Sequence, residues 1–173
     1  MGSCSLTGGL PIVCKDAMTG IKQLYIANFE NVTDVTFNNT NVATGITLSA
    51  GSFYTFNLLK EAADFTEPIN VSPQNGTSSY KPTLNMYLSK FSTSVRNVLV
   101  NLVKAKLMII FLDRNNQYWI CGYENGMDMS AGNGMTGKAY SGEQNGWTMT
   151  FDGDESVPAR EVSASIISAI ISA

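Results

Sequence analysis

Short runs of alternating hydrophobic and polar residues recur along this chain, and alternation with a period of two is the pattern of a half-buried β-strand. In the segment 22–29, KQLYIANF, Leu24 and Ile26 would lie on one face of a strand and Tyr25 and Ala27 on the other. Two runs rich in Thr and Val, VTDVTF and ATGITL, follow this segment and are separated by the turn-forming cluster NNTN. The first part of the chain therefore predicts strands joined by short turns.

The segment 52–71 contains two conflicting patterns. Aromatic and aliphatic residues alternate through SFYTFNL as in a strand, whereas LLKEAADF, which overlaps its end, has helical propensity. Because the alternation is strong and Thr-Glu-Pro ends the run, we interpret the segment as one long strand with a bend near Ala62–Ala63. The polar stretch 72–80, SPQNGTSSY, is then a loop.

Two later segments alternate more clearly and predict half-buried strands. In TLNMYLS, Asn85 and Tyr87 face away from the apolar residues, and in WTMTFD, Thr148, Thr150 and Asp152 do so. The two apolar faces consist of Leu84, Met86 and Leu88, and of Trp147, Met149 and Phe151.

One amphipathic helix is predicted at about residues 93–105, within STSVRNVLVNLVKAK. Ser92 or Thr93 can accept a hydrogen bond from an unpaired amide of the first turn. The apolar residues follow helical spacing: Val95, Val98, Leu99, Leu102 and Val103. A helix of three turns with so many β-branched residues is marginal alone, so we expect it to pack against a sheet.

The segments KLMIIFL and QYWICGY, joined by DRNN, predict a β-hairpin. Its first strand is apolar on both faces, which indicates a central strand covered on both sides, with one face under the helix. The following residues 122–146 contain seven glycines and predict a long connection to the strand that starts at Trp147. We expect residues 126–142 to be ordered chiefly by contact with a neighbouring subunit.

Within this glycine-rich region, Gly132, Gly134 and Gly137 have the G-x-G-x-x-G spacing of a dinucleotide-binding turn. That turn requires a strand that enters it and a helix that leaves it. The flanking sequences MDMSA and KAYSGEQNG predict neither, so we interpret the spacing as a chance match. No cofactor is expected.

The chain of 173 residues suits one domain, and we divide it into an N-terminal arm (1–20), a β-rich domain (21–160) and a C-terminal tail (161–173). With β-runs before and after a single helix, the fold class is an antiparallel β-sandwich or barrel with one helix packed against it. The apolar tail SASIISAIISA is too short to fold alone and is expected to dock on another surface.

Charge and chemistry narrow the function. Charged residues make up only 14% of the chain, the net charge is −3, and there is no Lys/Arg run, which argues against binding DNA by phosphate neutralisation. Histidine is absent, which excludes Ser-His-Asp and Cys-His nucleophile systems and His-containing metal sites. Cys4, Cys14 and Cys121 match no zinc spacing; Cys4 and Cys14 could form a disulfide, but reduced thiols are favoured in a protein made in the cytosol. No membrane segment is predicted.

The remaining chemical candidates are weak. The acidic turn DGDE (152–155) lacks the spacing of a known calcium loop, and we interpret it as a solvated turn. The acids at three-residue steps before Pro68 could act in general acid/base catalysis, but an exposed charged face explains them better. The aromatic residues that could line a ligand pocket are interpreted as core and interface residues: Tyr80, Tyr87, Tyr118, Trp119, Tyr123 and Tyr140. No enzymatic activity and no metal are expected.

The order of elements, with one amphipathic helix, a hairpin, a glycine-rich stretch and a final GWTMTF strand, resembles the tail-tube protein superfamily of tailed bacteriophages. That superfamily includes ring-forming proteins of phage tails and tail necks. The stretches GIKQLYIANFENV, LLKEAADFTEP and YENGMDMSAG…GEQNGWTMTFDGDE look like virion structural proteins of phages that infect Bacteroidetes, including crAss-like phages. The resemblance covers roughly residues 16–160.

The resemblance implies a non-enzymatic virion protein, made in the host cytoplasm, that self-assembles into rings or a tube in the tail or neck. Its partners would be other copies of itself, usually in a hexamer, and neighbouring tail or connector proteins, with DNA only passing through non-specifically. Candidate inter-subunit contacts are Gln74, Asn75, Tyr80, Met127, Met129, Asn133, Met135 and Tyr140. Candidate lumen-facing acids are Glu61, Asp64, Glu67, Asp152 and Asp154.

Two other functions remain open. The chain could be a β-sandwich adhesin or a receptor- or carbohydrate-binding module of a phage or cell surface, with Tyr123 and Tyr140 as its ligand platform. An enzyme would require Glu61, Asp64 and Asp152 to meet in one cleft with strongly shifted pKa values.

Overall fold

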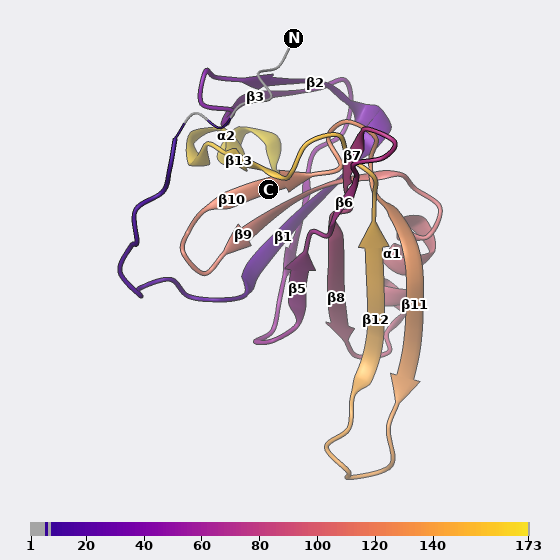
Figure 1. The fold of residues 1–173 in the computed structure, drawn as a ribbon. Helices are drawn as coiled ribbons and strands as arrows, with labels where there is room; N and C mark the ends of the chain where they lie inside the picture. The colour runs from indigo at the N-terminus through magenta and orange to yellow at the C-terminus, as the bar shows by residue number, and fades with distance from the viewer. Residues whose placement is uncertain (1–5, 7, 173) are drawn as a thin grey trace.

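A seven-stranded sheet forms the centre of the fold (Figure 1). The structure is a computed structural model that describes residues 6 and 8–172. The strand order of this sheet is β2-β3-β13-β10-β9-β1-β4, and all neighbours are antiparallel except β13 and β3. Its strands are β1 (Ile21–Asn28), β2 (Val32–Phe37), β3 (Ala43–Leu48), β4 (Tyr54–Asn57), β9 (Leu107–Asp113), β10 (Tyr118–Cys121) and β13 (Arg160–Val162). A 3-10 turn, η1 (Phe29–Asn31), links β1 to β2.

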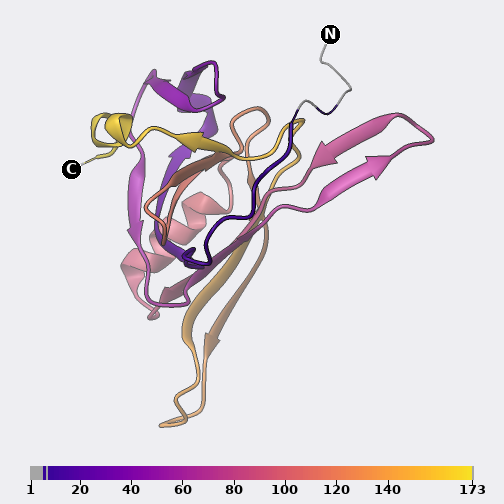
Figure 2. The same cartoon turned by 60° about the vertical axis from the view of Figure 1, so that its left-hand side comes forward.

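A four-stranded antiparallel sheet, β11-β12-β8-β5, lies across one face of the large sheet. It consists of β5 (Ala63–Thr66), β8 (Thr83–Ser89), β11 (Asp128–Thr136) and β12 (Asn145–Asp152). A separate hairpin of β6 (Ile69–Ser72) and β7 (Thr77–Tyr80) projects from the body (Figure 2). The mainly β prediction is confirmed, and within the described residues neither large sheet closes into a barrel.

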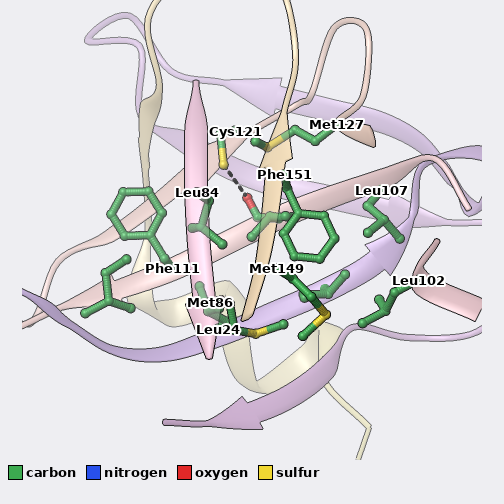
Figure 3. Close-up of a cluster of buried hydrophobic side chains, with 13 residues drawn as sticks. Leu24, Leu84, Met86, Leu102, Leu107, Phe111, Cys121, Met127, Met149 and Phe151 are labelled. Atoms are coloured by element: carbon green, nitrogen blue, oxygen red, sulfur yellow. Dashed lines mark hydrogen bonds between the residues drawn. The ribbon is translucent and has the colours of Figure 1, made fainter. Parts of the chain in front are cut away.

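The main core fills the space between the two sheets (Figure 3). Leu24 and Ile109 reach into it from the large sheet, and Leu84, Met149 and Phe151 reach into it from the small one. All five side chains are fully buried. The alternation predicted for β8 and β12 is therefore confirmed, because their apolar faces form one wall of this core.

A second core lies on the opposite face of the large sheet. Ile110 and Ile120 point into this core from the sheet, and a second helix, α2 (Ala164–Ile170), covers them with Ile167 and Ile170. The C-terminal residues, expected to form a tail outside the domain, contribute β13 and α2 to it. This C-terminal segment docks on its own domain. The Phe53 N–H donates to the Ile170 carbonyl, and the Ser172 N–H donates to the Phe53 carbonyl.

Strand β9 is central, as its two apolar faces predict. Ile109 points into the first core and Ile110 into the second, and both are completely buried. Its neighbours are β1 and β10, and the turn after it is held by Asp113, whose Oδ1 accepts from the backbone of Asn115 and Gln117 at 2.8 and 2.9 Å.

The predicted helix is present as α1 (Thr93–Leu102), a little shorter than expected. Ser92 is its N-cap, and its Oγ accepts from the Val95 N–H at 3.3 Å. Leu102 is buried in the main core, but Val98 and Val103 remain 39% and 55% exposed. The apolar stripe is thus only half covered, because α1 lies beside the open edge of the sandwich rather than across the middle of a sheet.

The prediction of one long strand over 52–71 was wrong. The segment forms β4, β5 and β6, which belong to three different sheets. The chain crosses between the two main sheets just before Ala62, where Glu61 adopts a left-handed φ of 61°. Residues 72–80, expected to be a loop, contain β7, which pairs with β6. Alternation identified the strands but not the sheet to which each belongs.

The glycine-rich connection is also not a loop. Strand β11 pairs with β12 from Asp128↔Asp152 to Thr136↔Asn145 and forms a long hairpin that extends beyond the body (Figure 1). Much of the segment expected to require a neighbouring subunit for order is thus paired within its own chain. Gly134 lies opposite Trp147, whose indole ring fills the space that a side chain at this position would need. In the described part of the chain, β12 and not a helix is the next element after this motif, so the strand–turn–helix context of a dinucleotide-binding turn is not formed here.

The two-sided burial of β9 predicts that truncation on either face is costly. Ile109→Ala and Ile110→Ala should each lower the free energy of unfolding by about 2–5 kcal/mol, because each leaves a cavity in a different core. Urea unfolding followed by circular dichroism measures this. Val100→Ala, at an exposed position of α1, is the control. A small effect at Ile110 with a large one at Ile109 would mean that α2 does not close the second core.

The glycines of β11 should respond unequally to substitution. A methyl group at Gly134 would clash with the Trp147 ring, whereas one at Gly132 would clash with the terminal methyl of Met129, which can move, and would make an ordinary contact with the Thr148 carbonyl. We expect Gly134→Ala to cost about 1–3 kcal/mol from overpacking and Gly132→Ala distinctly less. Chemical unfolding monitored by tryptophan fluorescence compares them, and equal effects would contradict the ring position.

Candidate assembly surfaces

The outer face of the four-stranded sheet is mainly polar. The side chains of β5, β8 and β12 that point away from the core, together with Asp128 of β11, are Asp64, Thr66, Thr83, Asn85, Tyr87, Asp128, Thr148, Thr150 and Asp152. Ala131, Asn133 and Met135 of β11 lie on the same side. These four strands contain three aspartates on that face and no Lys or Arg. The arrangement follows from the period-two alternation, which places every second residue of each strand on this side.

Hydrogen bonds link the strands across this face. The Asn85 Nδ2 donates to Asp64 Oδ2 at 2.9 Å, and the Thr150 Oγ1 donates to Asn85 Oδ1 at 2.8 Å. At the end of the face, Lys81 Nζ lies 3.2 Å from Asp152 Oδ2. These contacts hold the polar side chains in register across three strands and leave the face acidic.

The five candidate acids do not form one group. Asp64 and Asp152 lie on the polar face, whereas Glu61 lies in the crossing that precedes it, highly exposed and 3.9 Å from Lys60. Asp154 is exposed after β12. Glu67 accepts a hydrogen bond from the Ala159 N–H at 2.9 Å, and partial burial raises the pKa of its carboxyl group. Glu67 therefore has a structural role in the monomer.

The β11–β12 hairpin presents three of the candidate contact residues. Asn133, Met135 and Tyr140 are exposed, and Tyr140 at the tip is completely so. Met129 is half-buried near α1. The assignment of Met127 as a surface contact was wrong, because this residue is fully buried and its backbone exchanges two 2.8 Å hydrogen bonds with Leu107.

The β6–β7 hairpin presents Gln74 and Asn75 at its exposed tip, and the half-buried Tyr80 near its base. Sequence reasoning missed its apolar side: Ile69 and Val71 lie on one face and are 62% and 64% exposed. A two-stranded hairpin is at best marginally stable in water, so such a face suits a contact. The alternation of apolar and polar residues in the sequence INVS could have predicted this apolar face.

The structural role of Glu155 was also not evident from the sequence. It was assigned to a solvated turn, but it is only 3% exposed. Its two carboxylate oxygens accept from the N–H groups of Glu124 and Asn125, each at 3.1 Å. Burial raises the pKa of Glu155, and these two hydrogen bonds oppose the rise. Glu155 thus ties the segment after β10 to the segment after β12.

The two tyrosines considered as a ligand platform are in different environments. Tyr123 packs on Phe37 with ring centroids 5.3 Å apart, and the Arg160 guanidinium lies 4.4 Å from the Phe37 centroid. Burial raises the Tyr123 pKa to about 12. Tyr140 is at the tip of the long hairpin, and no shared aromatic surface results.

Three cavities open on the surface. The largest, about 530 Å³, lies between α1 and the β1–β4 edge; one of about 340 Å³ separates α1 from β11 and β12; and one of about 350 Å³ lies beside Phe37 and Tyr123. Glu61, Asp64 and Asp152 line none of these three. The described residues contain no cluster of three potential metal ligands.

The cysteines and helices add two observations. Cys14 is an exposed free thiol, Cys121 is buried and donates to the Ile109 carbonyl, and Cys4 lies outside the described residues together with its possible pairing. Among the described residues, neither α1 nor α2 has the length and apolar content to cross a membrane.

The chain was compared with protein families, curated proteins and solved structures. No protein-family profile, no curated protein and no solved structure matches this chain.

The buried carboxyl of Glu155 predicts a pH-dependent contribution to stability. Because its native pKa is raised above 4.5, the native state holds the proton more tightly than the unfolded chain does. This contribution is complete below about pH 4.5 and is lost as the pH rises through the native pKa. The stability of the wild type relative to Glu155→Gln should therefore fall as the pH rises through this window.

Urea unfolding at a series of pH values measures this difference, with Glu30→Gln at an exposed position as the control. A wild-type advantage over Glu155→Gln that grows with pH would contradict the assignment. Glu155→Ala, which removes both acceptors, should cost about 1–3 kcal/mol at neutral pH, because it leaves two backbone donors without their partner.

Proposed function

We propose that this protein is a non-enzymatic structural component of a phage virion that self-assembles into rings or a tube surrounding a DNA passage in the tail or neck. The proposal combines the resemblance to tail-tube proteins with the character of one surface. Virion localisation, homo-oligomerisation, with a hexamer as the expected ring, and contacts to neighbouring tail or connector proteins are parts of the same proposal.

The observation that supports it most is the polar outer face of the four-stranded sheet. A wall along which DNA slides should not retain phosphates, and an anionic surface repels them. The short side chain of Thr150 donates a hydrogen bond to Asn85 on the neighbouring strand instead of extending toward a ligand. A face with three aspartates and no cation within its strands suits this role, whereas a DNA-gripping surface needs clustered Lys and Arg.

The other surfaces favour assembly. Strands β2 and β4 end the large sheet and β5 and β11 end the small one, so both sheets present edges that a neighbouring subunit can cover. The β6–β7 hairpin exposes Ile69 and Val71, and the β11–β12 hairpin extends beyond the body. Both are shaped to reach another subunit.

A second candidate function rests on Tyr140. A fully exposed tyrosine at the tip of a projecting hairpin is also suited to stack on a sugar or receptor, as in an adhesin or a carbohydrate-binding module. Loss of glycan-array binding in Tyr140→Ala, with assembly unchanged, would favour this function over the passage.

Electron microscopy of the purified protein over a concentration range tests assembly, and Thr148→Lys tests which surface faces the passage. Thr148 is exposed on the polar face, so assembled Thr148→Lys protein should retain short duplex DNA at low salt, with a salt dependence that reflects phosphate contacts. Wild-type assemblies should retain much less.

Thr44→Lys, at an exposed position of β3 on the other sheet, is the matched control. Equal DNA retention by both lysine variants would contradict the assignment of the polar face to the passage. A strictly monomeric protein at high concentration that also fails to co-assemble with other tail proteins would contradict the function as a whole.

A further inference from the structure

The segment that precedes β1 exposes its apolar side chains. Residues 8–20 contain no helix or strand, and every one of them is exposed. Leu10 is 98% exposed, Ile12 102% and Val13 76%. Apolar side chains at neighbouring positions with so little contact to their own chain have a hydrophobic driving force to be buried elsewhere. We refer to residues 8–20 as the arm.

The cavity of about 530 Å³ between α1 and the β1–β4 edge offers an apolar surface of matching character. Tyr54, Phe56 and Ile26 line it from the sheet, and Val98 and Leu102 line it from α1. Tyr54 is 55% exposed and Val98 39% exposed, so the groove is open to solvent. It lies along β4, the last strand of the large sheet.

The edge of β4 beside the groove has free backbone groups. The Phe53 N–H and C=O point away from β1 and bond to the carbonyl of Ile170 and the N–H of Ser172. Because backbone groups alternate along a strand, those of Thr55 and Asn57 also point outward. Within the described residues, the C-terminal segment runs parallel to β4 as far as Ser172, beside Tyr54, so an added strand can pair only beyond this point, with the Thr55 carbonyl and the Asn57 N–H.

The sequence of the arm fits such an addition in parallel orientation. With Ile12 opposite Phe56, the Ile12 N–H would donate to the Thr55 carbonyl and its carbonyl would accept from the Asn57 N–H. The Ile12 side chain would then lie on the groove side, beside Phe56, whereas Leu10 stays outside the pairing because Ser172 already donates to the Phe53 carbonyl. Pro11, which has no N–H to donate, would face outward, where proline is tolerated on an edge strand.

The arm of the same chain starts on the wrong side to fill this groove. The Met18 N–H donates to Asn115 Oδ1 at 2.8 Å, and Asn115 Nδ2 donates to the Met18 carbonyl at 3.0 Å. Asn115 lies in the β9–β10 turn, on the other side of β1 from β4 and at its Ile21 end, whereas the groove lies at its Asn28 end. Figure 1 shows the arm leaving the start of β1 along the β9–β10 side.

We propose that the groove between β4 and α1 receives the Ile12–Val13 part of the arm from a second copy of this chain, with Ile12 paired in parallel with β4 beside Phe56. Donor and acceptor are different surfaces, so the contact is head-to-tail and leads either to a closed ring or to an open filament. This inference rests on the proposed self-assembly and names one contact that produces it.

The native thiol of Cys14, exposed at the end of this segment, allows a direct test. In a Cys4→Ser background, Val98→Cys places a second thiol in the groove, and Val100→Cys places one on the same helix outside it at nearly equal exposure, 38% against 39%. Assembled full-length protein is treated with a short bis-maleimide. We expect a ladder of cross-linked chains for Val98→Cys and only background for Val100→Cys.

Mixing two differently tagged chains identifies the donor. One chain keeps Cys14 and Val98, and the other carries Cys14→Ser and Val98→Cys, so any cross-link between tags must come from an arm on a different copy. Cross-linking confined to single chains, or equal for Val98→Cys and Val100→Cys, would overturn the inference. Amide hydrogen exchange of the assembly gives a further check. If the Val98–Leu102 amides stay protected after residues 2–17 are deleted, another segment fills the groove and the inference is overturned.

The results also separate the two proposals. Rings seen by electron microscopy without the Val98→Cys cross-link would refute the arm contact and leave the assembly function standing. A protein that stays monomeric and gives no cross-link would refute both.

Discussion

The fold depends on burying β9 on both faces. Ile109 and Ile110 are adjacent in the chain, point to opposite sides and are completely buried, so the large sheet must be covered twice. The four-stranded sheet with α1 covers one face, and α2 with the β2–β3 hairpin covers the other. Residues from the two ends of the sequence therefore meet on a strand from its middle, and the C-terminal segment becomes part of the core.

That arrangement also decides which surfaces remain for function. The four-stranded sheet uses its apolar side for the core, which leaves a polar side with aspartates, threonines and Asn85 joined by hydrogen bonds. Polar groups that do enter the interior are satisfied locally. Glu155 is the clearest case, because its carboxylate receives two backbone N–H groups while it holds two connecting segments together.

The surfaces left incomplete are the apolar ones at the periphery. The arm, the β6–β7 hairpin and the groove beside β4 each expose aliphatic or aromatic side chains outside the two cores. A chain with few charges and several such surfaces is suited to association with copies of itself. The proposed ring assembly and the proposed arm contact explain these surfaces together, since each removes apolar area that one subunit cannot cover by itself.

The sequence by itself determined the local elements. Alternation predicted the faces of β1, β8 and β12, the two apolar faces of β9 predicted its central place, and helical spacing with Ser92 as a cap predicted α1. These features depend on neighbouring residues only, so a local pattern is sufficient to reveal them. The polar face that supports the proposed function was predictable in the same way, and of the five candidate acids Asp64 and Asp152 lie on it.

The tertiary structure decided what local patterns cannot encode. It divided residues 52–71 among three sheets, paired the glycine-rich segment with β12 as β11, and buried Met127 and Glu155. In each case the decisive partner is distant in the sequence or belongs to another strand. Burial and pairing depend on such partners, whereas the alternation of side chains along a strand does not.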